Sequence, residues 1–364
     1  MKIKDITDHI EKLAPLSYAE DFDNVGLLVG NSNTIVTGIL ITLDTLEKTV
    51  NEAIEKKCNL IISFHPIIFS GLKRLNGNNY VEKVVLSAVK NDIAIYAIHT
   101  ALDNVKYGVS GKMCEMLGLK NLKTLIPKKG LIKKLTTYVP RENAATLRSK
   151  LFKAGAGNIG NYDHCSFNIE GTGSFKGGNL SNPVVGKKGE LTFSPETCIS
   201  VTYNDYQENT ILESLFRHHP YEEVAYELVT LDNKNQNIGM GMSGELQNAL
   251  DEGSFLNFVK KTFKSKCVRH TKPLGKSIKN IAVLGGSGSF AINNAIKAKA
   301  DAYISADFKY HDFFKSEEKI LLIDVGHYES ERFTKNLLVD YLSKKFSTFA
   351  IILSEESTNP IYYL

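Results

Sequence analysis

The chain has 364 residues, of which 43% are hydrophobic, so it can bury a substantial core and has room for two domains. Its formal net charge is only +4, and the lysines are scattered, so no polybasic tract demands nucleic acid or an anionic membrane as a partner. Five cysteines without a C-x-x-C pair argue against a disulfide framework and a thiolate zinc site. With no apolar leader and no run near the ~18 residues of a membrane span, we expect a cytoplasmic protein.

The first part of the chain alternates between strand and helix patterns. We predict helices at 3–13, 45–56, 80–90 and 109–117, and strands at 36–43, 59–63 and 93–98. The strands are short and almost continuously apolar, which is typical of strands buried on both faces. This order predicts βαβ units and a largely parallel sheet.

The pattern changes near residue 128. We predict a strand at 131–139, a helix at 141–153, strands at 163–169 and 196–203, a helix at 205–218 and a strand at 223–231. Two successive βαβ-like stretches of this kind resemble a ferredoxin-like α+β unit.

After a polar linker at 233–237 the first pattern resumes. We predict strands at 242–247, 279–284, 301–304, 319–324 and 347–353, and helices at 250–263, 288–298, 308–316 and 327–344. The fold class is therefore α/β, with a discontinuous mixed or parallel-sheet domain formed by 1–128 and 239–364. A ferredoxin-like insert domain at 129–238 interrupts it.

Side chains that commonly bind metals lie just beyond the ends of predicted strands. They are His65, Asp103, His327 and Glu331. Ligand sites in parallel α/β sheets gather beyond the carboxyl ends of the strands, so these side chains are directed at one crevice. His327 and Glu331 are four residues apart and share one face if a helix begins at Gly326. Histidine with carboxylates suits a divalent metal.

Each member of this set also has an ordinary structural explanation. His65 can cap a strand end before Pro66, Asp103 can stabilise a turn, and a His/Glu pair four residues apart can be a helix-surface pair. The metal-site hypothesis therefore rests on their conjunction.

Three further segments have suggestive composition. Asp307 and His311 follow another predicted strand and suit outer-shell or substrate contacts. The glycines of 285–289 offer an anion cradle, but they match neither dinucleotide nor P-loop spacing, which favours a tight turn. His218 and His219 precede Pro220, which ends a helix, and we leave this pair outside the main site.

Several motifs, in this order, resemble the Nif-three-like family, whose members are often named GTP cyclohydrolase 1 type 2 homologs. The motifs are Asp23-Asn-Val-Gly-Leu27, Phe64-His-Pro66, His99-Thr-Ala-Leu-Asp103, Gly155-Ala-Gly-Asn-Ile-Gly-Asn-Tyr162, Glu170-Gly-Thr-Gly173, His219-Pro-Tyr-Glu-Glu223 and Gly326-His-Tyr-Glu-Ser-Glu331. The resemblance extends over nearly the whole chain.

The resemblance implies a discontinuous α/β domain with a dinuclear metal centre, an insert similar to PII and CutA proteins, and a toroidal homohexamer. By position, His65 and Asp103 would bind one metal, His327 the other, and Glu331 would bridge both. Many members have His-His-Pro where this chain has Phe64-His-Pro66, so the second metal loses a nitrogen ligand. One or two ions per subunit remain open, as do Zn, Fe, Mn, Ni and Co as the metal.

Three functions follow from this reading. The first is a metal-dependent hydrolase, for which the family name suggests GTP as substrate, with His99, Asp307 or His311 as proton carriers. The second is a metal-storing, metal-delivering or metal-sensing ring that its insert regulates. The third is a nucleic-acid-binding toroid, which the slight basicity of the chain and the toroidal assembly implied by the resemblance suggest, and it is the last of the three alternatives because no polybasic tract is present.

Overall fold

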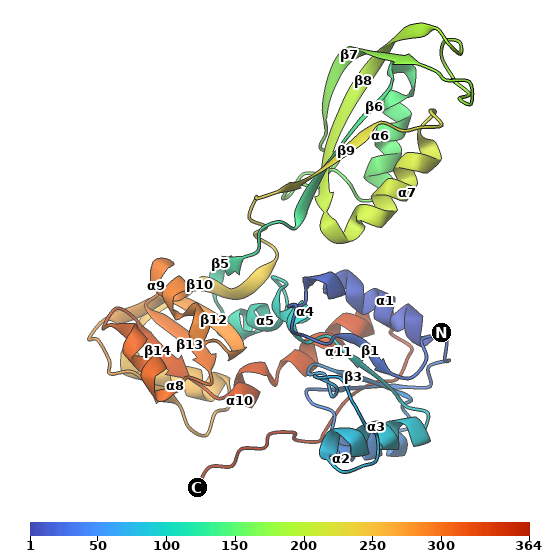
Figure 1. Ribbon diagram of the computed structural model, residues 1–364. Helices are drawn as coiled ribbons and strands as arrows, with labels where there is room; N and C mark the ends of the chain where they lie inside the picture. Colours follow the sequence, from blue (N-terminus) through green and yellow to red (C-terminus); the bar gives the residue numbers. More distant parts are fainter. The chain divides into compact units, whose positions relative to one another are not determined.

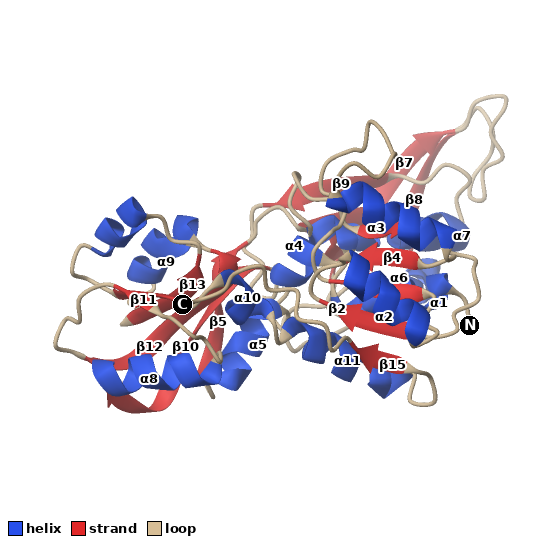
Figure 2. Cartoon of the chain, turned by 90° about the horizontal axis from the view of Figure 1, so that it is seen from below, coloured by secondary structure: helices blue, strands red, loops and turns tan.

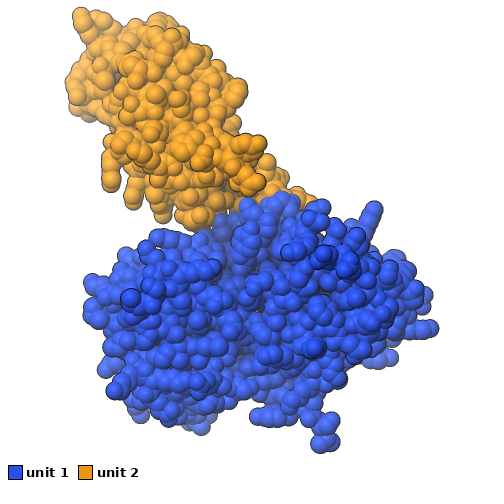
Figure 3. Space-filling view, turned by 180° about the vertical axis from the view of Figure 1, so that it is seen from behind, with its two compact units in different colours: residues 1–127, 236–364 blue, residues 128–235 orange.

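A computed structural model describes residues 1–364 and divides into two compact units (Figure 3). Unit 1 consists of Met1–Pro127 and Gln236–Leu364, and unit 2 is Lys128–Asn235. Unit 2 therefore begins and ends slightly before the insert domain that the sequence pattern predicts at 129–238. No helix has both the length and the apolar character that crossing a membrane requires.

Unit 1 contains two mixed sheets instead of the single largely parallel sheet that the sequence pattern predicts. The first has the strand order β1-β4-β3-β2-β15. Its strands are β1 (Gly26–Val29), β2 (Ile39–Thr42), β3 (Leu60–Ser63), β4 (Ala94–Ala97) and β15 (Ile351–Leu353). All neighbours are parallel except β1 and β4, and every residue of β2, β3 and β4 is buried, as expected for strands covered on both faces.

Helices cover both faces of this sheet (Figure 1). The elements are α1 (Ile3–Leu13), α2 (Glu47–Glu55), α3 (Tyr80–Lys90) and α11 (Thr334–Lys345). Val50, Val84 and Ala88 from α2 and α3 pack with Leu40 and Ile61 on one face. On the other face α11 packs on β2 and β15, and its Tyr341 stacks on His9 of α1.

The second sheet has the order β11-β14-β13-β12-β10-β5. Its strands are β5 (Lys120–Pro127), β10 (Gly239–Asp251), β11 (Arg269–His270), β12 (Ser277–Ser287), β13 (Ala302–Ala306) and β14 (Leu321–Asp324). The three strands β12, β13 and β14 are parallel, and the other pairs are antiparallel. The sequence pattern missed β5, which pairs with a strand distant in sequence and is half exposed, so it lacks a continuous apolar run.

Helices also flank this second sheet, and α8 and α9 lie on opposite sides of it (Figure 2). These elements are α5 (Val109–Met116), α8 (Glu252–Thr262), α9 (Ile292–Lys297) and the 3-10 segment η5 (Tyr310–Ser316). Phe255 of α8 and Met113 of α5 share one core with Ile281 and Ile323, whereas Ile292 of α9 packs with Tyr303 in another.

The predicted helix at 327–344 is two helices. α10 (His327–Glu331) packs on β12 and β13 of the second sheet, and α11 packs on the first sheet. The chain changes sheets between them, which a single straight helix does not allow. As a result α10 lies where the two sheets of unit 1 approach each other. The short elements η1 (Leu16–Tyr18), α4 (His99–Asp103) and η4 (Ser289–Ala291) complete the unit.

Unit 2 has one sheet with the order β7-β8-β6-β9, in which all neighbours are antiparallel. In chain order it contains β6 (Ile132–Pro140), η2 (Arg141–Asn143), α6 (Ala144–Lys153), β7 (Phe167–Lys176), β8 (Leu191–Asn204), η3 (Asp205–Gln207), α7 (Glu208–His218) and β9 (Tyr226–Leu231). Leu147 of α6 and Ile211 of α7 pack with Leu135 and Ile199 on one face of the sheet.

Candidate metal centre

Three potential ligands converge from the two sheets of unit 1. His65 follows β3 of the first sheet, whereas His327 and Glu331 lie at the two ends of α10 beside the second sheet. One ligand atom from each of these residues lies within 4.8 Å of the others. The crevice that holds them is therefore formed between two sheets, not beyond the edge of one.

The carboxylate of Glu331 lies between the two imidazoles. Its Oε2 atom is 3.2 Å from Nε2 of His65 and 3.1 Å from Nε2 of His327. This oxygen is fully buried and makes no hydrogen bond. A buried carboxylate oxygen is costly unless it is paired, and two imidazole nitrogens with one carboxylate oxygen are a donor set that divalent metals accept. The residues thus fit a metal ion.

A carboxylate contacts the Nδ1 atom of each imidazole and so orients the ring. Nδ1 of His65 lies 2.8 Å from Oδ1 of Asp44, and Nδ1 of His327 lies 2.7 Å from Oδ2 of Asp307. When Nδ1 donates its proton to a carboxylate, Nε2 is the nitrogen left to face a metal. The pairs therefore direct both Nε2 atoms toward Glu331.

The charges of this group are strongly coupled. Burial alone would raise the pKa of Glu331, but His65 and His327 lower this pKa to about 2. Burial alone would lower the pKa of His65, but Glu331 and Asp44 raise it to about 10. The pKa of His327 is raised to about 11, against the effect of burial, by Asp307 and Glu331. Metal binding must therefore displace protons from the two Nε2 atoms.

Asp103 is the fourth predicted ligand, and it lies at the end of α4. It lines a cavity of about 280 Å³ together with His99, His327 and Glu331, but it is not one of the three converging residues. Enclosure of its carboxyl group, and then the negative charge of Glu331, raise the pKa of Asp103 well above its ordinary value. A cation in the cavity would reverse this effect and favour the ionised carboxylate.

In the segment 285–289, the absence of a side chain at Gly286 leaves the space that Glu331 occupies. Gly286 has a φ of +66°, and a Cβ atom there would collide with Oε1 of Glu331. Its backbone N–H donates to Oγ of Ser330 over 2.9 Å. This packing gives Gly286 a structural role beside α10. The tight turn expected from the sequence is wrong for residues 285–287, which belong to β12, and the pairing of β12 with β13 shifts register between Val283 and Ser287.

The three residues predicted as proton carriers lie at different places relative to the cavity. His99 lines the cavity, and Asp307 supports His327. His311 is exposed, its ring packs on Tyr310 and Phe314 within η5, and it is not among the residues that line the cavity. Asp307 precedes η5 and His311 lies within it, so one helix does not carry both side chains although they are four positions apart.

The histidines left outside the site are held by hydrogen bonds in unit 2. Nδ1 of His218 donates to the carbonyl oxygen of Ser214. Nε2 of His219 lies 3.0 Å from the carbonyl oxygen of Tyr138, and its Nδ1 accepts from the N–H of Tyr221. Both ring nitrogens of His219 are therefore occupied.

Sequence reasoning missed two carboxylates. Asp44 follows the predicted strand 36–43 directly, so the strand-end rule that selected His65 also applies to it. Asp23 pairs with Nδ1 of His99 over 2.8 Å and accepts from the N–H of Thr100 over 3.0 Å. Burial would raise the pKa of Asp23, but these hydrogen bonds lower it to about 2. Only its place in the first family motif marked it in the sequence.

Phe64 lies beside the site and is fully buried. Its ring centroid is 4.9 Å from that of His65 and 5.5 Å from that of His99. The ring packs against both histidines, which also contact each other, and it offers no ligand atom at this position.

Comparisons with known proteins agree with the resemblance in the sequence motifs. The model of the family Duf34/NIF3 (NGG1p interacting factor 3) matches residues 1–360. A GTP cyclohydrolase 1 type 2 homolog of Bacillus subtilis is 35% identical over 363 residues, covering 97% of this chain and 96% of that protein. The homolog of the same name from Staphylococcus aureus strain MSSA476 is 33% identical over 369 residues and covers 100% of both chains.

A solved structure is also similar over its whole length. The crystal structure of a Bacillus cereus protein related to NIF3 has a TM-score of 0.85 and 34% sequence identity, covering 100% of this chain and 99% of that one. The family model, the two relatives and this structure all extend across both units of the fold. The chain therefore belongs to the Duf34/NIF3 family.

Proposed function

We propose that this protein binds a divalent metal ion through His65, His327 and Glu331. The observation that carries the proposal is the buried Oε2 of Glu331, which has no hydrogen bond and faces two imidazole nitrogens. The carboxylates behind both imidazoles support it, because such pairs fix the ligand nitrogen that faces the metal. Elemental analysis of the purified protein, with metal affinity measured by calorimetry, tests this function.

We propose that Asp103 contributes to a second, weaker metal position. Its carboxyl group lines the same cavity as His327 and Glu331, so a bridging role for Glu331 places a second ion within reach. The family resemblance implies a nitrogen ligand for this second ion at position 64, and Phe64 does not supply one. The result would be one ion held tightly and one held weakly.

The activity that this arrangement supports best is metal-dependent hydrolysis. A divalent ion here would polarise a substrate oxygen and lower the pKa of a coordinated water. The protein's own contribution would be the pair of His99 and Asp23. Because Nδ1 of His99 is held by Asp23, its Nε2 is the nitrogen available to take a proton within the cavity.

The relatives' name, GTP cyclohydrolase 1 type 2 homolog, supports GTP as the first substrate to test. The experiment follows formate release from GTP by protein whose metal content has been measured. Turnover that is lost in His99→Gln, with metal content unchanged, would support the role of His99. An inactive preparation with full metal occupancy would reject GTP as substrate and leave the metal site standing.

A ring that stores, delivers or senses metal is the second candidate, and Phe64 is the observation that favours it. Two catalytic ions need a complete ligand set, and a carbon ring at this position weakens one of them. The homohexamer implied by the family resemblance would form the ring. Absence of turnover in a broad hydrolase screen, together with reversible metal exchange, would favour this candidate.

We also propose that unit 2 is a ferredoxin-like insert domain. Its elements follow the order β-α-β-β-α-β, its sheet is antiparallel, and its two longer helices pack on one face of the sheet. A regulatory role for this unit requires a ligand or partner of its own.

A further inference from the structure

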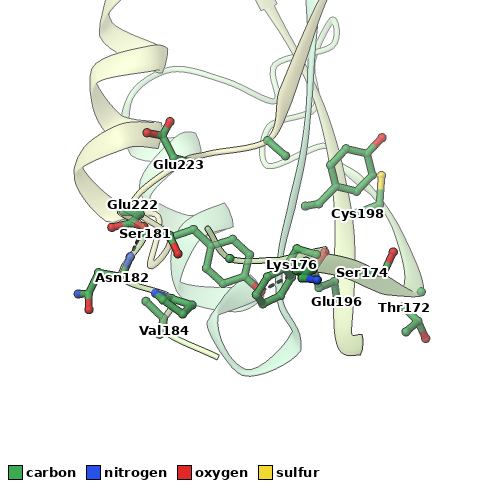
Figure 4. A pocket seen from close by; sticks show the side chains of 18 of the residues that line it. Thr172, Ser174, Lys176, Ser181, Asn182, Val184, Glu196, Cys198, Glu222 and Glu223 are labelled. Carbon is green, nitrogen blue, oxygen red and sulfur yellow. Dashed lines mark hydrogen bonds between the residues drawn. The ribbon is translucent and has the colours of Figure 1, made fainter. Parts of the chain in front are cut away.

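Unit 2 contains a cavity of about 550 Å³ that the metal centre does not use (Figure 4). It lies on the sheet face opposite α6 and α7. Leu135 and Ile199 point to the helices, so Tyr138 and Cys198, which are an odd number of positions away on the same strands, point to the other face. The loops at 181–184 and 221–223 form its walls. A cavity of this volume accommodates a small organic molecule.

Glycines of β7 hollow out this face of the sheet. A Cβ atom at Gly171 would meet nothing within 4 Å, and one at Gly173 would collide with the carboxylate of Glu196. Glycine weakens a strand and commonly marks a position where another group approaches closely. Both glycines belong to the motif Glu170-Gly-Thr-Gly173, which the sequence singled out and the metal centre leaves unexplained.

Glu196 is the buried polar group of the cavity, with an exposed fraction of 8%. Its Oε1 accepts a hydrogen bond of 2.7 Å from the hydroxyl of Tyr221, and its Oε2 makes no hydrogen bond within the protein. Burial, and then the contact with Glu196, raise the pKa of Tyr221 to about 12, so this hydroxyl remains a donor at neutral pH. Glu196 therefore keeps one acceptor oxygen for a ligand.

The motif His219-Pro-Tyr-Glu-Glu223 holds this wall in place. Because the N–H of Tyr221 must donate, Nδ1 of His219 accepts, and Nε2–H donates to the carbonyl oxygen of Tyr138. The imidazole thus joins the loop to β6. Burial lowers the pKa of His219, which is consistent with the neutral ring that this arrangement needs.

The charges around the cavity favour a cation. Three carboxylates line it, those of Glu196, Glu222 and Glu223, against the single ammonium group of Lys176. Figure 4 shows Glu222 joined to Asn182, whose backbone N–H donates to its carboxylate over 2.5 Å. This bond fixes the loop over the cavity without neutralising the acid.

Aromatic and apolar side chains provide the remaining surface. Tyr138, Phe175 and Tyr221 line the cavity, and the ring centroids of Phe175 and Tyr221 are 6.1 Å apart. Ile169 and Val184 add aliphatic surface. Aromatic faces attract organic cations, and apolar surface stabilises a hydrophobic body.

We propose that this cavity binds a small organic cation that has N–H donors and an apolar or aromatic body, such as an arylalkylammonium ion. The ammonium group would donate to Oε2 of Glu196, and the body would lie against Ile169, Phe175 and Val184. The site is separate from the metal centre in both its residues and its chemistry.

Calorimetry and thermal shift on the full-length protein test this proposal with phenethylamine at millimolar concentration. The matched ligands are 3-phenylpropionate, which exchanges the cation for an anion, and 3-phenylpropanol, which is neutral. We expect phenethylamine to bind, with at least ~10-fold weaker binding of both matched ligands, as is typical when a charged hydrogen bond is lost.

Three variants locate the binding. Glu196→Gln should weaken phenethylamine binding about 10-fold or more, whereas Glu190→Gln, which changes an exposed acid outside the cavity, should not. Gly171→Val adds a side chain into the open space of the cavity and should abolish binding while the protein retains its melting temperature. This variant keeps the test decisive even if Glu196→Gln folds poorly.

Absence of binding by phenethylamine at millimolar concentration would overturn the proposal. Equal or tighter binding of 3-phenylpropionate would also overturn it, because the charge assignment would then be wrong. Binding that survives Gly171→Val would place the ligand elsewhere.

Discussion

Asp44 lies 2.8 Å from Nδ1 of His65 and so leaves Nε2 of that imidazole facing Glu331. The second oxygen of Asp44 is itself engaged, by the hydroxyl of Thr358 in the C-terminal segment. The orientation of a candidate metal ligand therefore depends on a carboxylate from the end of another strand. That carboxylate in turn depends on a residue more than three hundred positions away.

Asp44→Asn should weaken metal binding about 10- to 100-fold, which is the usual effect of losing such a supporting carboxylate. The amide is a poorer acceptor and no longer favours the tautomer with a proton on Nδ1. Calorimetric titration with Zn²⁺ measures the change, and Asp21→Asn, an exposed acid outside the site, is the matched control. Equal affinities in the two variants would show that Asp44 has no positioning role.

Glu331→Gln should lose most of the bound metal while the protein stays folded. The carboxylate serves the two imidazoles and the proposed ion, and no core side chain depends on its charge. Elemental analysis after dialysis measures metal content, and circular dichroism checks the fold. Glu115→Gln, on an exposed part of α5, should retain the metal. Unchanged metal content in Glu331→Gln would mean that the ligands are wrongly assigned.

Phe64→His should raise the number of tightly bound ions from one toward two per chain. The new imidazole would supply a nitrogen beside His65 and His99, where the phenyl ring now supplies only carbon. Phe64→Leu removes the ring without adding a ligand and serves as the control. If both variants bind the same number of ions, position 64 does not limit the second metal.

Protonation of His219 should destabilise the protein below about pH 6.5, the ordinary pKa of histidine. Burial lowers the pKa of His219 in the folded state, so the unfolded chain takes up the proton first as the pH falls. Stability is therefore retained above the unfolded pKa and declines as the pH drops toward the folded pKa. Calorimetric unfolding near pH 7.5 and near pH 5.5 measures this loss.

His219→Gln is the variant that isolates this effect, because an amide keeps donor and acceptor atoms but does not titrate. The difference in melting temperature between the two pH values should be smaller in the variant. His164→Gln, which changes an exposed histidine of the same unit, should leave the difference unchanged. A pH dependence that is identical in His219→Gln and the parent protein would assign the acid sensitivity to other groups.

The sequence was most informative where burial alone decides the structure. The strands that contain Ile61, Ile95 and Ile323 are short, apolar and fully buried, so their positions and the ligands that follow them were predictable. The division into two sheets was not, because every buried parallel strand has the same apolar pattern whichever sheet it joins.

The carboxylates that contact the site's histidines were harder to predict, because they come from distant parts of the sequence. Asp23 reaches His99 across 76 positions of sequence, and the local pattern around Asp23 indicates only a turn. His311 illustrates the reverse case. Its position after a predicted strand suggested an outer-shell or substrate contact, but it lies in η5, where its imidazole is exposed.

Anomalous scattering from crystals soaked separately in Zn²⁺ and Mn²⁺ tests the central claim most directly. We expect a peak about 2.0–2.2 Å from Nε2 of His65, Nε2 of His327 and a carboxylate oxygen of Glu331. A peak in contact with these three residues in the parent protein, and its loss in Glu331→Gln crystals, would support the metal centre. Fully soaked crystals with no peak at these residues, or with metal only at His218 or other surface groups, would contradict it.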